Sequence, residues 1–175
     1  FLHEKYKDEP AILHRFVEEA QIGGQLQHPG IVPVHELGMS DGRPFFTMKM
    51  VKGQTLAKKL ADRPSPATDR RTFLSTFEDI CQTMAYAHAR GVIHRDIKRG
   101  NVLLATEDDA RPGPKLTDFG LAPLPAAGVP ESAAFAGTPN YMSPEQCEGR
   151  WRDYGPWTDL YALGCLAWAL VSGGP

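Results

Sequence analysis

The chain has few cysteines, almost no net charge and no long uncharged apolar run. Cys81, Cys147 and Cys165 lie far apart without CxxC spacing, which argues against a zinc site or disulfide framework and favours reduced, mostly packed thiols. A formal net charge of −2 gives no reason to expect a nucleic acid as partner. The nearest candidate for a membrane span, Leu160 to Val171, is too short and predicts a buried helix.

What the chain does contain is the composition of a globular domain, with 42% hydrophobic and 23% charged side chains over 175 residues. It opens on the strand-like pair Phe1-Leu2 and stops just after a strongly apolar helix. We therefore expect it to be a piece of a longer protein.

The first third of the chain predicts a helix followed by two strands. Pro10 suits a first helical position, apolar residues repeat with helical period from Leu13 to Ala20, and the segment 28–30 (His-Pro-Gly) stops the helix. Two strands are expected at 31–34 and 45–48, around a turn at 40–42.

A hinge-like break near 49–53 separates this part from a mainly helical one. Thr55 can cap a short helix that runs through Leu60. The clearest helix has one apolar face, formed by Leu74, Phe77, Cys81, Met84 and His88 with Ile80 beside them, and it ends at Gly91.

Short apolar runs follow this helix and predict strands at 92–93, 102–104 and 115–117. The segment 123–137 is rich in Pro, Ala and Gly and is expected to be mobile without a ligand. A final helix is expected at 157–171. The whole order fits an α+β protein divided into residues 1–50 and 51–175.

The most informative stretch is 94–101, His-Arg-Asp-Ile-Lys-Arg-Gly-Asn, followed by 115–120, Lys-Leu-Thr-Asp-Phe-Gly. Singly, Asp96 would be read as a turn residue and Lys98 as a surface lysine. Together with Asn101 and Asp118 they provide a proton acceptor, a charge-neutralising ammonium and two hard oxygen donors at short, fixed offsets. Phosphoryl transfer needs that set of groups.

On these motifs the chain resembles the protein kinase family, and specifically its serine/threonine branch. The resemblance implies a bilobal protein-kinase-like fold, truncated at both ends, with residues 1–50 as a partial N-lobe and residues 51–175 as a partial, mainly helical C-lobe. A general likeness in the segments 16–20 and 143–146 points to the bacterial type. The implied reaction moves the γ-phosphoryl group of ATP to serine or threonine hydroxyls of proteins, with Mg²⁺ as cofactor.

The resemblance assigns roles within two loops, which we call the catalytic loop (94–101) and the metal loop (115–120). Asp96 is the expected catalytic base, and Lys98 offsets charge near the γ-phosphate. Asn101 and Asp118 are the expected magnesium ligands. Phe119 is expected to pack under the first helix.

The resemblance also implies a nucleotide pocket. Glu19 would pair with a lysine that stands just before Phe1, and a solvated helix glutamate is the alternative. Met48 would guard the back of the pocket, and the backbone of Lys49 and Val51 would bind the adenine edge. Leu103 would lie under the base, a role compatible with plain core packing.

Three residues are expected to regulate the loop that carries Asp96. Arg95 would pair with a phosphate on the activation segment 118–145. Ser132, the only hydroxyl side chain between Gly120 and Ala136, is the proposed phosphosite, with an inconsequential loop serine as the alternative. Asp159 would accept backbone N–H groups near His94 and Arg95.

The segment 137–145 resembles the substrate-docking loop of the family, although Ser143 replaces its usual alanine. Thr138 would contact Asp96 and Lys98, which suits a serine or threonine acceptor. Glu145 normally pairs with an arginine in a late helix, so we expect it to lack its partner here.

The sequence departs from the family pattern at two places. The family usually has proline at the position of Arg99, and alanine followed by a basic residue at the position of Ala122-Pro123; neither change removes a reactive group.

Two other functions remain as alternatives: a pseudokinase that acts as a binding or scaffold module, and a small-molecule phosphotransferase of kinase-like fold. The expected partners are protein substrates, and the expected location is the cytoplasm. A membrane anchor on the full-length chain, with this domain on the cytoplasmic side, and a dimer through the catalytic domain are left open. We expect these 175 residues alone to be inactive, because the Gly-rich loop, the strand lysine and the last C-lobe helices are lacking.

Overall fold

The computed structural model of the chain describes residues 2, 9–119 and 138–173. Its elements, in chain order, are α1 (Pro10–Gln25), β1 (Val34–Ser40), β2 (Arg43–Met48), β3 (Gly53–Thr55), α2 (Leu56–Ala61), α3 (Arg70–His88), β4 (Val102–Ala105), β5 (Gly113–Leu116), η3 (Pro139–Tyr141), α4 (Pro144–Cys147), η4 (Trp151–Asp153) and α5 (Pro156–Ser172). The fold is therefore α+β, as the sequence predicts.

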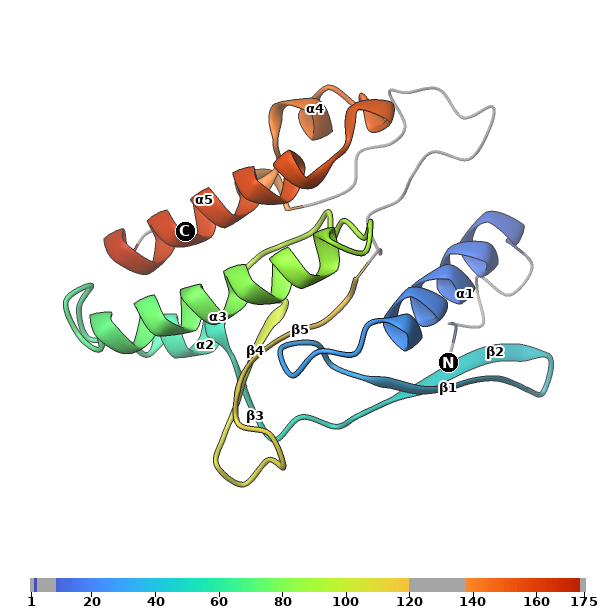
Figure 1. Cartoon of the computed structure of the whole chain (residues 1–175), viewed down its shortest axis with the longest axis horizontal. Helices are drawn as coiled ribbons and strands as arrows, with labels where there is room; N and C mark the ends of the chain where they lie inside the picture. Colours follow the sequence, from blue (N-terminus) through green and yellow to red (C-terminus); the bar gives the residue numbers. More distant parts are fainter. Residues whose placement is uncertain (1, 3–8, 120–137, 174–175) are drawn as a thin grey trace.

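One part of the molecule is the helix α1 packed on the hairpin of β1 and β2 (Figure 1). Pro10 takes the first position of α1, where its missing N–H costs no hydrogen bond. The hairpin is antiparallel and turns at Asp41-Gly42, where both residues have positive φ. Its first strand begins at Val34 rather than at Ile31, so the predicted strand 31–34 is wrong in its bounds. Ile31 instead makes an isolated parallel bridge to Leu116.

The other part begins after residues 49–52, which form no helix or strand. The strands β3, β4 and β5 form an antiparallel sheet in that order. Thr55 caps α2 as predicted, because its Oγ1 accepts a hydrogen bond from Lys58 N at 3.2 Å. The segment 92–93 forms no strand, so that prediction is wrong.

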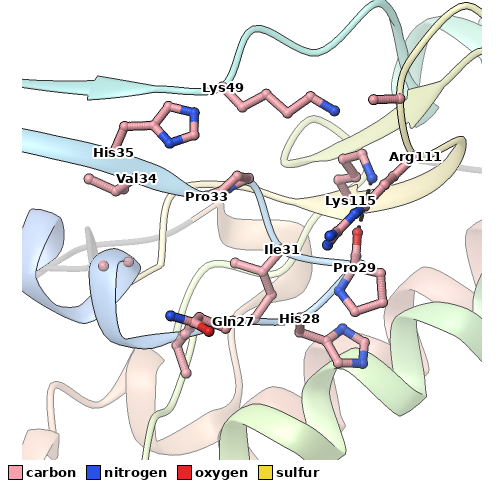
Figure 2. Close-up of a pocket in the computed structure, with 14 residues that line it drawn as sticks. Gln27, His28, Pro29, Ile31, Pro33, Val34, His35, Lys49, Arg111 and Lys115 are labelled. Carbon is pink, nitrogen blue, oxygen red and sulfur yellow. Dashed lines mark hydrogen bonds between the residues drawn. The ribbon is translucent and has the colours of Figure 1, made fainter.

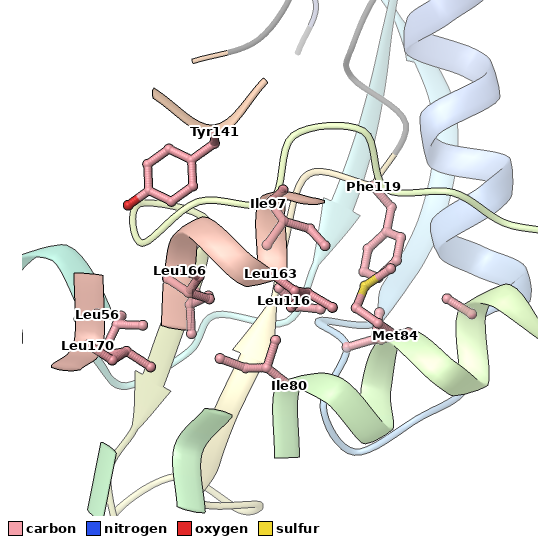
Figure 3. Close-up of a cluster of buried hydrophobic side chains, with 14 of the residues drawn as sticks. Leu56, Ile80, Met84, Ile97, Leu116, Phe119, Tyr141, Leu163, Leu166 and Leu170 are labelled. Carbon is pink, nitrogen blue, oxygen red and sulfur yellow. The ribbon is translucent and has the colours of Figure 1, made fainter. Parts of the chain in front are cut away.

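The helices α3 and α5 lie side by side, with α3 against β5 of this second sheet, and their facing side chains form the main core (Figures 1 and 3). Figure 3 shows Ile80 and Met84 of α3 close to Leu163 and Leu166 of α5. Leu116 of β5 lies beneath them and is 1% exposed. Burial of such apolar side chains is the main stabilising contribution to the fold.

The predicted apolar face of α3 is partly wrong. Leu74 is 49% exposed, whereas the preceding Phe73 is buried. The buried stripe also includes Thr76, Thr83 and Ala87. These small side chains allow close packing: a Cβ on Gly30 would collide with Thr83 Oγ1. Hydrophobicity alone therefore placed the stripe one position too far along the helix.

The cysteines are free, which agrees with the predicted reduced thiols. Cys81 and Cys165 are partly buried, and burial raises the pKa of both. Cys147 is exposed, so it is not packed as expected. Across the residues described, no helix combines the length and the apolar character that crossing a bilayer requires.

Candidate functional site

The catalytic-loop residues named from the sequence converge on one carboxylate. Lys98 Nζ donates to Asp96 Oδ2 at 2.6 Å, and Asn101 Nδ2 donates to the same oxygen at 3.0 Å and to Asp96 O at 2.8 Å. The other carboxylate oxygen, Asp96 Oδ1, is buried and has no hydrogen-bond partner among the described residues. A buried acceptor without a partner is costly, and such groups are concentrated at functional sites.

A second carboxylate holds the backbone of this loop. Asp159, at the start of α5, is 0% exposed and accepts from His94 N and Arg95 N, each at 2.8 Å. These are the backbone contacts that the sequence predicts for Asp159. Arg95 has φ +70°, an unfavourable conformation for a residue with a side chain. The two bonds hold the loop in that conformation.

Sequence reasoning did not foresee the third partner of Asp159. His88, at the end of α3, lies with its Nε2 2.8 Å from Asp159 Oδ2 and donates to it. The pattern placed His88 only on an apolar helix face. An imidazole at the end of a helix that precedes the catalytic loop was the available signal.

His94 joins the catalytic loop to the metal loop. Its ring is fully buried, and its Nε2 donates to Thr117 O at 3.1 Å while Nδ1 accepts from Asp96 N at 3.4 Å. Burial lowers the pKa of His94, against the opposing attraction of Asp159 and Asp96. One donor and one acceptor nitrogen describe a neutral imidazole. Its ring packs on Phe119, with centroids 4.5 Å apart.

The metal loop follows β5. Asp118 has φ +63°, and its Oδ1 accepts from Thr117 Oγ1 at 3.1 Å. Thr117 N donates to Asn101 O at 3.1 Å, which draws the two predicted metal ligands toward each other. Phe119 is buried and lines a small recess with Met48, Asp118 and Gly23 of α1. The predicted packing of Phe119 beside the first helix is therefore present.

The donor chemistry suits magnesium. Asn101 uses its Nδ2 on Asp96, so its amide oxygen remains for a cation, and Asp118 adds a carboxylate. The described residues contain no cluster of three or more His, Cys, Asp or Glu side chains able to hold a metal ion. Mg²⁺ is commonly held by one or two protein oxygens together with phosphate oxygens and water, so this sparse set fits it.

The segment between the two parts leaves backbone groups free. Lys49 N donates to Pro33 O at 3.0 Å, while Lys49 O and the amide of Val51 make no backbone hydrogen bond within the described part of the chain. Met48 is 39% exposed at the end of β2, and Leu103 is partly buried on β4. The predicted nucleotide-pocket residues therefore lie on the connection and on the sheet that follows it.

Asp109 is a structural residue that the sequence did not reveal. It is buried, although it follows Glu107 and Asp108 in the polar loop between β4 and β5. Its carboxylate forms an ion pair with Lys49 and accepts from Arg111 N at 3.0 Å and Lys52 N at 3.3 Å. The Lys49 hydrogen bond, followed by that from Arg111, holds the pKa of Asp109 far below its usual range. Asp109 thus fastens the connecting segment to the β4–β5 loop.

The predicted docking segment is tied to the catalytic loop through Gln146. This buried side chain donates from Nε2 to Arg95 O at 2.8 Å and accepts from Ser143 N at 3.1 Å. Thr138 lines a small recess with Asp96. Among the described residues, however, no hydrogen bond joins Thr138 to Asp96 or Lys98, so the predicted polar contact is absent.

Among the described residues Glu145 makes no ion pair with an arginine, as expected, but it is not left without a hydrogen bond. Its Oε1 accepts from Thr158 Oγ1 at 2.7 Å. Burial raises the pKa of Glu145, but the Thr158 hydrogen bond and several smaller contributions outweigh that effect, and the net shift is downward. A hydroxyl from α5 therefore satisfies this carboxylate among the described residues.

Three predictions fall where the structure does not describe the atoms concerned. Glu19 lies on α1, but its side chain is outside the described set. Ser132 and the segment 123–137, which the sequence predicts to be mobile, lie outside the described residues altogether.

Comparison with known proteins agrees with this arrangement. The protein kinase domain model matches residues 2–175. The chain is 33% identical over 174 residues to the serine/threonine-protein kinase Pkn1 of Myxococcus xanthus, covering 98% of this chain and 24% of that protein. It is 37% identical over 167 residues to the DNA damage-responsive serine/threonine-protein kinase RqkA of Deinococcus radiodurans, covering 92% and 24%.

A solved structure shows the same fold. The PknI kinase domain of Mycobacterium tuberculosis superposes with a TM-score of 0.74 at 29% identity, covering 99% of this chain and 62% of that one. The chain spans about a quarter of the length of these two curated relatives. Matched along nearly its whole length by the family model, and carrying the convergent loops described above, the chain belongs to the protein kinase family.

Proposed function

We propose that the protein is an ATP-dependent serine/threonine protein kinase. The proposal rests on the hydrogen bonding of the Asp96 carboxylate. Its Oδ2 accepts from Lys98 and Asn101, and its Oδ1 is buried without a hydrogen-bond partner among the described residues. A proton acceptor fixed in this way is ready to receive a hydrogen bond from a substrate hydroxyl.

The reaction follows from that geometry. The substrate hydroxyl donates its proton to Asp96 Oδ1 as its oxygen bonds to the γ-phosphorus and the bond to ADP breaks. Lys98 offsets the negative charge of the transferring group, and Asn101 holds Asp96 in place. A bound Mg²⁺, with Asn101 and Asp118 as ligands, would neutralise phosphate charge. General base catalysis of this kind contributes about 10²- to 10⁴-fold in rate, and the remainder comes from positioning and electrostatics.

The nucleotide would lie against the connecting segment. The free carbonyl of Lys49 and the amide of Val51 provide an acceptor and a donor for the adenine edge. Met48 closes the back of this pocket, and Leu103 supplies part of its apolar floor. Glu19 would pair with a lysine upstream of Phe1.

Substrate and regulatory roles complete the proposal. Thr138 and the docking segment anchored by Gln146 would position the acceptor peptide. Arg95 and a phosphate on Ser132 form the proposed pair that orders the activation segment. The guanidinium Nε of Arg95 is buried and has no hydrogen-bond partner among the described residues.

We place the domain in the cytoplasm, where ATP is available. A dimer through the catalytic domain stays a prediction.

The test is phosphate transfer by the full-length protein from [γ-³²P]ATP with Mg²⁺ to a general protein substrate such as myelin basic protein, with phosphoamino-acid analysis. We expect phosphoserine or phosphothreonine, and a loss of kcat of about 10²-fold or more in Asp96→Asn without loss of nucleotide binding. The matched control is Asp79→Asn, an exposed aspartate on α3.

Two results would contradict the proposal. Nucleotide binding without any transfer by the wild type would favour the pseudokinase reading. Transfer to a small molecule alone would favour a phosphotransferase.

A further inference from the structure

A cavity of about 650 Å³ lies next to the connecting segment and is lined by no residue of the catalytic loop 94–101. Figure 2 shows the side chains that line it. It is lined by the end of α1, the segment 26–31, the start of β1 and the β4–β5 loop. None of Asp96, Asn101, Leu103 or Asp118 lines it. Lys49, whose backbone is proposed to bind the adenine edge, does line it. Its volume is that of an ordinary small-molecule site, and none of the groups proposed to react lies in it.

One end of this cavity is positively charged. Lys49, Arg111 and Lys115 come from three different places in the chain and line the same wall (Figure 2). The buried carboxylate of Asp109 pairs with Lys49. The charges of Arg111 and Lys115 are left without a carboxylate partner among the described residues.

Lys115 is the most informative of these side chains. It is 3% exposed, yet its ammonium has one hydrogen bond, to Pro29 O at 3.0 Å. A buried charge is normally paired, and an ammonium has three donors. Burial, followed by repulsion from Lys49, lowers the pKa of Lys115 against the attraction of Asp109. An anion in the cavity would give the ammonium a partner and offset the repulsion between the cations.

Away from these cations, the apolar side chains of Leu26, Ile31, Pro33 and Val34 line the cavity. The polar side chains of Gln27, His28 and His35 lie among them. Figure 2 shows Val34 and Pro33 on the opposite side of the view from Arg111 and Lys115. A ligand that fills the cavity therefore needs an anionic head and an apolar body.

We propose that this cavity binds a small organic anion, with its phosphate or carboxylate group on Arg111 and Lys115 and its apolar part against Ile31 and Val34. Charge-assisted hydrogen bonds from Arg and Lys provide the affinity for the head group. The proposal does not depend on phosphoryl transfer, because none of the proposed reacting groups takes part.

The test uses the full-length protein saturated with a non-hydrolysable ATP analogue and Mg²⁺, so that the nucleotide site is occupied. Phenyl phosphate, benzoate, inorganic phosphate and benzyl alcohol are titrated in turn, and binding is followed by ligand-observed NMR. We expect saturable binding of phenyl phosphate or benzoate, weaker binding of inorganic phosphate, and none of benzyl alcohol. Which of the two aromatic anions binds more tightly identifies the preferred head group.

Substitutions in the cavity wall test whether the titrated anions bind there. Arg111→Gln replaces an exposed side chain and should weaken binding about tenfold or more while leaving kinase activity unchanged. Lys115→Met should weaken it similarly, and Arg71→Gln, an exposed arginine on α3, should leave it unchanged. No saturable binding, or binding that Arg111→Gln does not weaken relative to Arg71→Gln, would overturn the proposal.

Discussion

Replacing Asp159 by asparagine tests whether the catalytic loop is held in an unfavourable conformation from outside. The carboxylate is fully buried and accepts from His94 N, Arg95 N and His88 Nε2, each at 2.8 Å. An asparagine keeps one acceptor oxygen but turns an NH₂ group toward the remaining donors. At least one buried N–H is then left without a partner.

The magnitude follows from these contacts. Each buried N–H group left without an acceptor costs about 1 to 3 kcal/mol, a large share of a typical domain stability of about 5 to 15 kcal/mol. Arg95 at φ +70° stores about 1 to 3 kcal/mol of strain, which Asp159→Asn releases as the loop relaxes. Asp96 then moves away from its position, and a displacement of about 1 Å can cost about 10²-fold in rate.

The assay combines three measurements on the full-length protein. Urea unfolding of the catalytic domain should show the lost free energy, hydrogen exchange should accelerate at the amides of His94 and Arg95, and kcat should fall. Asp79→Asn serves as the control, because Asp79 is exposed. If Asp159→Asn unfolds within 1 kcal/mol of the wild type, and the two amides keep their protection, the reasoning is refuted.

Two more predictions rest on side chains outside the catalytic loop. Asp109→Asn should lower the urea midpoint at neutral pH, because the folded state holds the pKa of Asp109 below its unfolded value of about 4. The stabilisation from the ionised Asp109 carboxylate is present above pH 4 and is lost as the pH falls further. The urea midpoints of the wild type and the variant should therefore converge in acid. A difference in midpoint that does not change with pH would contradict the pairing of Asp109 with Lys49. Gln146→Leu leaves Arg95 O without its side-chain donor and should cost about 1 to 3 kcal/mol. We expect it to raise KM for the protein substrate more than KM for ATP, and an equal rise in both would place its effect elsewhere.

Most of the helices and strands, and the residues proposed for the chemistry, could be predicted from local patterns along the chain. Fixed offsets in the segment 94–101 and in 115–120 predict a proton acceptor and two metal ligands. The structure brings the two loops together through the hydrogen bond from Thr117 N to Asn101 O. Local signals also set the start of α1 at Pro10 and the cap of α2 at Thr55, since both depend on neighbouring backbone groups alone.

The side chains that hold those loops in place by hydrogen bonds became evident only in the folded structure. His88 and Gln146 carry no motif; they matter because folding brings them to Asp159 and Arg95, which are 51 or more residues away in the chain. The buried face of α3 and the position of Asp109 were likewise settled by packing against Gly30 and Lys49. Spacing along the chain specifies contacts within a loop or a helical turn, whereas contacts between distant segments depend on which surfaces the folded chain brings together.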